Sequence, residues 1–162
     1  MLVLDRLVAQ GIVLAEPAGK AVLYRLNRDH LMAPSILAMA GARTELIARL
    51  RSAIEAWQVP PVHASLFGSV ARHDAGPHSD VDVLVVRPDD VAADNAAWER
   101  QLRDLEEDVS RWTGNTLAWF ETTREDLGRA VQAEEPVVDS WRQDALALAG
   151  QGLRPLLLGV SR

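Results

Sequence analysis

The strongest constraint on the fold is a pair of aspartates at the start of an apolar run. Residues 79–86 read SDVDVLVV. Side chains alternate along a strand with a period of two, so Asp80, Asp82, Leu84 and Val86 project from one face and Val81, Val83 and Val85 from the other. Two nearby carboxylates repel one another unless a cation lies between them. Oxygen ligands on a rigid strand suit Mg²⁺, so the pattern predicts a strand with a metal site at its start.

A second polar element precedes this strand. Residues 65–72 read SLFGSVAR, in which an apolar run ends at Gly68 and is followed by the hydroxyl of Ser69. A glycine turn lets backbone N–H groups approach an anion closely, and Ser69 supplies a further hydrogen bond if a helix begins there. Arg72, one turn later, adds a guanidinium group suited to phosphate. We therefore expect a phosphate-binding turn beside the metal-binding strand.

These residues resemble the GS…AR…SDxD signature of the DNA polymerase β-type nucleotidyltransferases, and most closely the minimal nucleotidyltransferases of bacteria and archaea. The resemblance covers roughly residues 62–127. The matching positions are Gly68-Ser69, Ala71-Arg72 and Ser79-Asp80-Val81-Asp82. The resemblance implies an α+β fold, with a nucleotidyltransferase-like mixed β-sheet and helices packed on it.

The same resemblance implies roles for the motif residues. Asp80 and Asp82 would be the catalytic metal ligands for Mg²⁺ or Mn²⁺. The nucleotide-binding residues would be Gly68, Ser69, Arg72 and Ser79. The implied reaction transfers AMP from ATP, or a nucleotide from another nucleoside triphosphate, to a hydroxyl of a partner protein. Minimal nucleotidyltransferases often act as antitoxins on a HEPN-type toxin, which makes such a toxin the expected partner.

A third carboxylate, which the family takes from a later strand, is missing. The later strand is expected over residues 115–121, and the acidic position falls at about Ala118. Glu121 lies nearby with the opposite strand parity, so it reaches the same face only across a bulge. In related enzymes this carboxylate can activate the attacking hydroxyl. Its absence supports an alternative function, a catalytically weak or inactive module in a DNA-binding transcriptional regulator.

The N-terminal residues 1–33 resemble the second half of a winged-helix domain. A helix over residues 2–8 is expected to end near Gly11, followed by strands at 12–15 and 21–26 with a turn at 16–20. Either the chain starts downstream of its natural beginning, or this half-domain packs on its neighbour, or it pairs with a second copy as a homodimer. The basic residues of the hairpin are either solvated or contact the DNA backbone. They are Lys20, Arg25 and Arg28.

The remainder divides into a connecting helix over residues 34–59 and a nucleotidyltransferase domain over residues 60–162. In that domain we expect an amphipathic helix ending at Gly114 and helices on one side of the sheet. A last helix is expected from Pro136 through Leu148. His63 is expected to be structural, and His73 and His78 to be solvated loop residues.

Composition excludes several other classes of protein. The chain has no cysteine, which rules out disulfides and zinc–thiolate sites. No apolar run approaches the length needed to cross a bilayer, so we expect no membrane association and a cytoplasmic protein. The net charge of −6 argues against extensive nucleic-acid binding by the acidic second part of the chain.

Overall fold

The computed structural model describes residues 3–74, 76 and 79–159. The chain forms two compact units, Met1–Glu45 and Leu46–Arg162. Within the described ranges, no helix combines the length and the apolar character needed to cross a membrane.

The first unit contains a short helix, a β-hairpin and a second helix. They are α1 (Val3–Ala9), β1 (Val13–Ala18), β2 (Ala21–Leu26) and α2 (Ala33–Ala40). Gly11, with φ +73°, follows α1 as expected. The expected turn over 16–20 is shorter than predicted, because the two strands stay paired up to Ala18 and Ala21. Pro17 lies inside β1, which an edge strand tolerates because one side of its backbone is unpaired.

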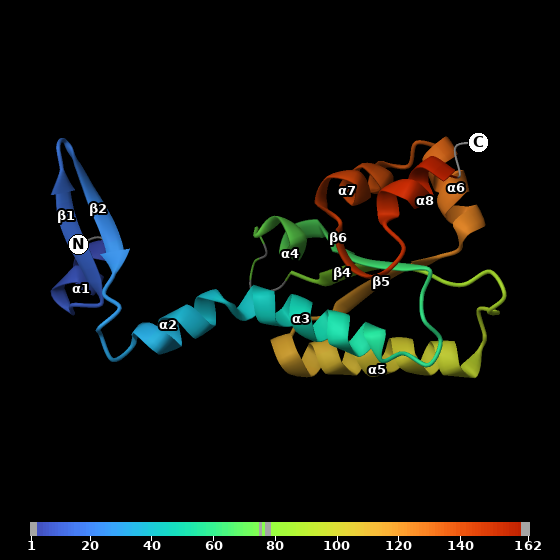
Figure 1. Ribbon diagram of the computed structural model, residues 1–162, viewed down its shortest axis with the longest axis horizontal. Helices are drawn as coiled ribbons and strands as arrows, with labels where there is room; N and C mark the ends of the chain where they lie inside the picture. Colours follow the sequence, from blue (N-terminus) through green and yellow to red (C-terminus); the bar gives the residue numbers. More distant parts are fainter. Residues whose placement is uncertain (1–2, 75, 77–78, 160–162) are drawn as a thin grey trace. The chain divides into compact units, whose positions relative to one another are not determined.

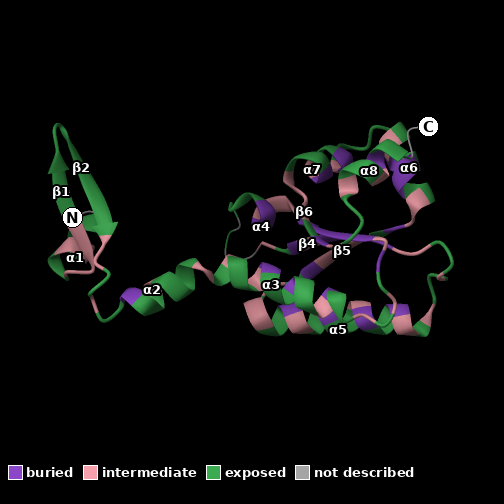
Figure 2. Cartoon of the chain, in the orientation of Figure 1, coloured by how far each residue is buried: buried purple, intermediate pink, exposed green. Residues whose placement is uncertain are grey.

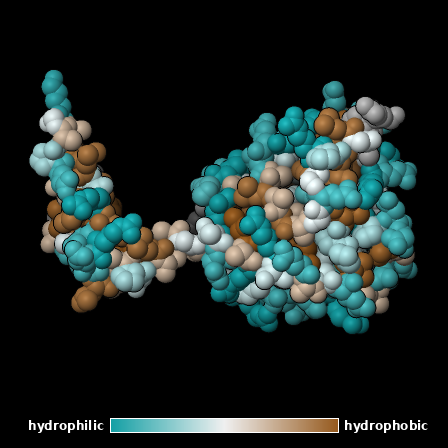
Figure 3. All heavy atoms as spheres, in the orientation of Figure 1, coloured by the Kyte–Doolittle hydropathy of each residue, from teal (hydrophilic) through white to brown (hydrophobic). Residues whose placement is uncertain are grey.

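This first unit buries very little of its apolar surface. Ala33 is the single buried residue among those described in it, and the hairpin is exposed along most of its length (Figure 2). Hydrophobic atoms are correspondingly visible on its surface (Figure 3). Its exposed large hydrophobic residues are Val3, Leu4, Val22, Leu23, Tyr24, Leu31, Met32, Leu37 and Met39. A two-stranded hairpin with so little core is marginally stable by itself.

The connecting helix expected over residues 34–59 consists of two helices. α2 ends at Ala40, and α3 spans Ala42–Glu55. Gly41 separates them, and its N–H donates to the carbonyl oxygens of Leu37 and Ala38 at 3.0 and 3.2 Å. Glycine has a low helix propensity, which accounts for the break. Farther along, the buried side chains of α3 belong to the core of the second unit, so this helix is part of the folded domain.

The second unit is built on a four-stranded mixed sheet in the order β5-β4-β3-β6. The strands are β3 (His63–Phe67), β4 (Val81–Val86), β5 (Leu117–Thr122) and β6 (Leu146–Gly150). β3 is antiparallel to both β4 and β6, whereas β4 and β5 are parallel. This arrangement confirms the expected α+β class with a mixed sheet.

β6 was not expected from the sequence. The expected helix from Pro136 ends early, as α7 (Pro136–Asp144), and the chain then forms this edge strand. The strand sequence LALAG has no β-branched residue, so its conformation depends on pairing with β3. Gly150 is required at its end, because it has φ +77° and an added Cβ would lie 2.3 Å from the Val62 carbonyl oxygen.

Helices cover both faces of the sheet, and the expectation of helices on one side is wrong (Figure 1). α3 and α5 (Ala96–Thr113) pack on one face, against Val81, Val83 and Val85 of β4. α6 (Arg124–Gln132), α7 and α8 (Leu153–Gly159) pack on the other, against Leu84 and Val86. Both sets of β4 side chains are apolar beyond Asp82, so each face must be covered.

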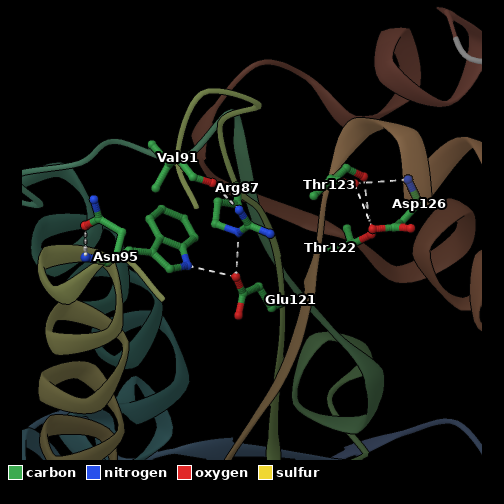
Figure 4. A network of polar contacts seen from close by, with 8 residues as sticks. Arg87, Val91, Asn95, Glu121, Thr122, Thr123 and Asp126 are labelled. Atoms are coloured by element: carbon green, nitrogen blue, oxygen red, sulfur yellow. Dashed lines mark hydrogen bonds and ion pairs between the residues drawn. The ribbon is translucent and has the colours of Figure 1, made fainter. Parts of the chain in front are cut away.

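Polar caps mark the start of two of these helices. Asn95 precedes α5, and its side chain accepts hydrogen bonds from the N–H groups of Ala97 and Trp98, both at 3.0 Å. Thr123 precedes α6 and accepts from the N–H of Asp126 at 3.1 Å, while its hydroxyl donates to the Asp126 carboxylate (Figure 4). Thr123 and Asp126 thus form a capping pair at the start of α6.

Candidate functional site

The glycine turn lies at the end of β3, where α4 (Gly68–Arg72) begins immediately. Phe67 is extended, and Gly68 then turns the chain with φ +72°. Phe67 pairs with Asp82 of β4, which brings the Asp82 side chain against the turn. A Cβ added at Gly68 would lie 2.2 Å from the Asp82 Oδ2 atom. Position 68 therefore requires glycine for its backbone conformation and for the space that the carboxylate occupies.

The two aspartates differ in their surroundings. Asp82 is half-buried on β4, whereas Asp80 lies just before the strand and is exposed. Burial raises the pKa of Asp82, the negative charge of Asp80 raises it further, and the positive charge of Arg72 opposes both effects. A carboxylate in this position favours a cation close by.

This donor set fits a hard divalent cation such as Mg²⁺. Two carboxylates on one strand end supply the one or two protein ligands that Mg²⁺ commonly takes, leaving other positions for phosphate and water. Within the described residues, no group of three or more His, Asp or Glu side chains is arranged to hold a metal. Asp80 and Asp82 would therefore hold such a cation without a third carboxylate.

The two serines of the motif follow Gly68 and precede Asp80 directly in the chain. Ser69 is half-buried in the first turn of α4, beside Gly68, and its carbonyl oxygen accepts from the N–H of Asp74 at 3.1 Å. The Ser79 hydroxyl oxygen accepts from the N–H of Gly76 at 2.8 Å, next to Asp80. Ser79 therefore helps to shape the chain that leads into β4.

Arg72 connects the site to the C-terminal helices. Its Nη1 atom donates to Asp144 Oδ2 at 2.6 Å, and its Nε atom donates to Asp74 Oδ2 at 3.2 Å. These hydrogen bonds raise the pKa of Arg72. Asp144 is the last residue of α7, and its side chain is only 11% exposed. A carboxylate at a helix C-terminus is disfavoured by the helix dipole, so the Arg72 cation compensates for its position.

Sequence reasoning missed Asp144. It lies 72 residues from Arg72 along the chain, and no local motif surrounds it. Only the packing of α7 near α4 brings the two side chains together.

Ala118, where the resemblance led us to expect a third carboxylate, pairs directly with Asp82 across the parallel strands β4 and β5. Glu121, the weak candidate that would have needed a bulge, does not lie beside Asp82. The register between β4 and β5 runs without a shift, so the bulge that Glu121 would need is absent and Glu121 pairs with Val85.

The Glu121 carboxylate has a different role in the structure. It accepts hydrogen bonds from Trp98 Nε1 and Arg87 Nε, both at 2.9 Å (Figure 4). Arg87 also donates to the carbonyl oxygen of Val91. Glu121 thus satisfies the polar atom of a fully buried tryptophan and ties β5 to α5.

A sequence model of the nucleotidyltransferase domain family matches residues 47–139, which is more than half of the chain. The chain belongs to this nucleotidyltransferase domain family. No curated protein matches the chain. Among solved structures, one described as a toxin-antitoxin with AMP-PNP is similar, with a TM-score of 0.43 and 15% sequence identity. That similarity covers 74% of this chain and 83% of the other.

His63 lies in the interior at the other end of β3 from Phe67, the residue that pairs with Asp82. Its Nδ1 atom is 2.6 Å from the Gln151 carbonyl oxygen, and its Nε2 atom is 2.9 Å from Ser65 Oγ. Burial lowers the pKa of His63, and the hydrogen bond to Gln151 opposes this effect. A neutral ring then donates from Nδ1 to Gln151 and accepts at Nε2 from the Ser65 hydroxyl. These contacts are structural, as expected.

The remaining candidate residues that the structure describes lie on exposed segments. His73 is exposed and ends α4 in a left-handed conformation with φ 67°, and His78 lies outside the described residues. In the hairpin, Arg25 donates to the Glu16 carboxylate at 2.8 and 2.6 Å. Lys20 and Arg28 are exposed in turns. Contact of these basic residues with DNA stays a prediction.

Proposed function

We propose that the protein transfers AMP from ATP to a hydroxyl group of a partner protein. In this reaction the acceptor oxygen attacks the α-phosphorus of ATP and forms a new P–O bond. The bond to the β-phosphate breaks, pyrophosphate leaves with the electron pair, and the hydroxyl proton passes to solvent. The choice of ATP and of a protein acceptor follows from the resemblance to minimal nucleotidyltransferases.

The observation that supports this proposal most is the contact between Gly68 and Asp82. A turn with positive φ is pressed against a half-buried carboxylate, so closely that a Cβ at position 68 would lie 2.2 Å from Oδ2. A structural turn has no need of a charged group at this distance. A site that holds phosphates and their cation side by side does need one, because both must lie within a few ångströms.

In this proposal each residue of the site has a role in binding the triphosphate or Mg²⁺. The N–H groups at Gly68 and Ser69 bind the triphosphate, and Arg72, oriented by Asp144, attracts it electrostatically. Asp80 and Asp82 hold Mg²⁺, which when bound neutralises phosphate charge and polarises the phosphoryl group. These groups orient the α-phosphorus for in-line attack.

Transfer would be slow, because no carboxylate on β5 is positioned to take the hydroxyl proton. Ala118 stands beside Asp82, and a general base typically contributes about 10² to 10⁴-fold to the rate. Binding of nucleotide is less affected, since the phosphate turn and the two aspartates do not depend on that position.

The experiment that tests this proposal compares the fate of two labels. The protein is incubated with Mg²⁺, cell extract and ATP labelled at either the α- or the γ-phosphorus. Nucleotidyl transfer predicts label on a protein from α-labelled ATP and none from γ-labelled ATP. The Asp80→Asn, Asp82→Asn double variant is expected to lose this labelling, and Asp90→Asn, an exposed aspartate after β4, is the matched control. Equal labelling by the double variant would contradict the proposal.

A second candidate function is favoured by Ala118 itself. In this case the nucleotidyltransferase fold binds nucleotide without efficient transfer and serves as a sensing module in a DNA-binding regulator. This function predicts tight Mg²⁺-dependent ATP binding by calorimetry, no labelling of any target, and DNA binding that weakens when Lys20 and Arg28 are changed to alanine. Labelling from α-labelled ATP at many turnovers would exclude it as the sole function.

A further inference from the structure

A cavity of about 530 Å³ lies in the second unit, bounded by β3, β6, α7 and α8. Most of its lining is apolar, and its size falls in the range of small-molecule sites. Its apolar lining residues include Trp141, Ala145, Ala147, Leu153, Leu157 and Leu158. Leu158 is 64% exposed, and it is the sole large hydrophobic side chain so exposed among the described residues of this unit. The cavity thus presents apolar surface to an incoming molecule.

The floor of the cavity is rigid. His63 and Ser65 of β3 line it, are fully buried, and are hydrogen-bonded to each other at 2.9 Å. His63 is also held by the Gln151 carbonyl oxygen at 2.6 Å. Because both ring nitrogens have partners, the floor does not need to rearrange when a ligand binds. A preformed site loses less conformational entropy on binding than a flexible one.

The charge of the lining is opposite in sign to that of the chain. Arg142 and Arg154 both line the cavity, and none of the described lining residues is acidic, although the chain has a net charge of −6. Within the described part of the chain, Arg154 has no ion-pair partner. Arg142 contacts Asp139 at 3.3 Å, but both side chains are more than half exposed, and such a pair contributes little. Two guanidinium groups beside an apolar wall select an anion.

The cavity is separate from the nucleotide site. Gly68, Ser69, Asp80 and Asp82 are not part of its lining. Trp141 is fully buried, and its ring packs against Phe120 with the ring centroids 4.7 Å apart. We propose that this cavity is a second binding site, for a small organic anion that has an apolar body and a carboxylate or phosphate group. This second site is a binding function separate from nucleotidyl transfer, and the proposal does not depend on the proposed transfer activity.

The test uses three probes with one ring system, namely 2-naphthoate, 2-naphthyl phosphate and the neutral 2-naphthalenemethanol. Each is titrated into the full ¹⁵N-labelled chain, and amide shifts are followed by NMR. We expect the two anions to shift amides of α7, β6 and α8, with the neutral alcohol binding about tenfold more weakly or worse, because it lacks the charged hydrogen bonds. The stronger of the two anions identifies the acidic group that the site prefers.

Variants separate the cavity from the nucleotide site. Arg142→Ala with Arg154→Ala should weaken the anions about tenfold, since charge-assisted hydrogen bonds are lost. Arg111→Ala on α5 is the matched control. Ala147→Trp, at an exposed position of β6, should fill the cavity and abolish binding. An Asp80→Asn, Asp82→Asn protein should bind 2-naphthoate as the unmodified protein does.

Several results would overturn the inference. Equal binding of the neutral alcohol would mean that the cavity is only an apolar surface. Shifts confined to residues 68–72 and 80–82, or displacement of 2-naphthoate by saturating MgATP, would mean that the anions occupy the nucleotide site. If Ala147→Trp does not fold, as judged by its NMR dispersion, the test depends on the Arg142→Ala, Arg154→Ala double variant alone. Unchanged affinity of that variant for the two anions would refute the site.

Discussion

Substitution of Gly68 by alanine tests whether the glycine turn fixes the position of the Asp82 carboxylate. Two costs are expected, and the structure separates them. The first is conformational, because Gly68 has φ +72°, a region in which a residue with a Cβ is strained by about 1–2 kcal/mol. The second is steric, because the new Cβ would lie 2.2 Å from Asp82 Oδ2 and 3.0 Å from its Cγ.

The steric clash is expected to lower the activity more than the stability, because it displaces the Asp82 carboxylate. Ordinary van der Waals contact begins at 3.4 Å, so the Asp82 carboxylate must retreat by the difference from 2.2 Å, about 1.2 Å. A displacement of about 1 Å of a group that positions the reactants can lower the rate about 100-fold. We therefore expect Gly68→Ala to lose about two orders of magnitude in kcat/KM for MgATP, with a modest loss of stability.

Gly114→Ala provides the matched control. Gly114 has φ +74°, almost the same backbone strain, but among the described residues no atom beyond its chain neighbours lies within 4 Å of the position that a Cβ would take. Urea unfolding should therefore show a loss of about 1–2 kcal/mol for this variant, and its activity should stay unchanged.

A double-mutant cycle isolates the contact. In an Asp82→Ala background the obstructing carboxylate is gone. Gly68→Ala should then lower the free energy of unfolding only by the conformational part, as Gly114→Ala does. The difference between the two backgrounds measures the interaction between position 68 and Asp82. The reasoning is refuted if Gly68→Ala lowers the free energy of unfolding equally in both backgrounds and the Gly68→Ala single variant retains its MgATP turnover.

Three further predictions concern the base, a buried histidine and Arg72. Ala118→Asp places a carboxylate beside Asp82 and should raise the transfer rate about 10²-fold or more, measured with α-labelled ATP; an unchanged rate would argue against a missing base. The folded pKa of His63 lies below its ordinary value of 6.5, so its contribution to stability is complete above 6.5 and is lost as the pH falls toward the folded pKa. The urea midpoint should therefore drop between about pH 7.5 and about pH 5.5, and by less in His63→Gln; an equal drop would contradict this. Asp144→Asn should raise the KM for ATP with little change in kcat, and Arg72→Ala should raise it further; an unchanged KM in Asp144→Asn would exclude a positioning role.

Local patterns were sufficient to predict most elements of the fold. Alternation in β4 correctly assigned Val81, Val83 and Val85 to one face and Leu84 and Val86 to the other. Elements without strong local signals were missed. β6 has neither β-branched residues nor turn signals at its start, and the coverage of both sheet faces depends on where distant helices pack. These features arise from long-range pairing, which periodicity does not report.

The candidate site divides in the same way. Spacing in the motif was enough to place Gly68 and Asp82 on adjacent elements, because a glycine turn and an alternating strand are local structures. The contact of Asp144 with Arg72 and the engagement of Glu121 by Arg87 depend on segments far apart in the chain. No local rule links such residues.

The order of residues alone was enough to predict two carboxylates at the start of a strand, a glycine turn before it, and an alanine where the resemblance implies an acid. Backbone conformation and side-chain alternation are set over a few residues, so they can be inferred from neighbours. The unbroken register that keeps Glu121 away from Asp82, and the arginine-lined cavity between α7, α8 and the sheet edge, required the folded chain. The register and the cavity depend on how whole helices and strands pack together. This packing is driven by the total apolar surface that the chain buries, to which no single segment contributes alone.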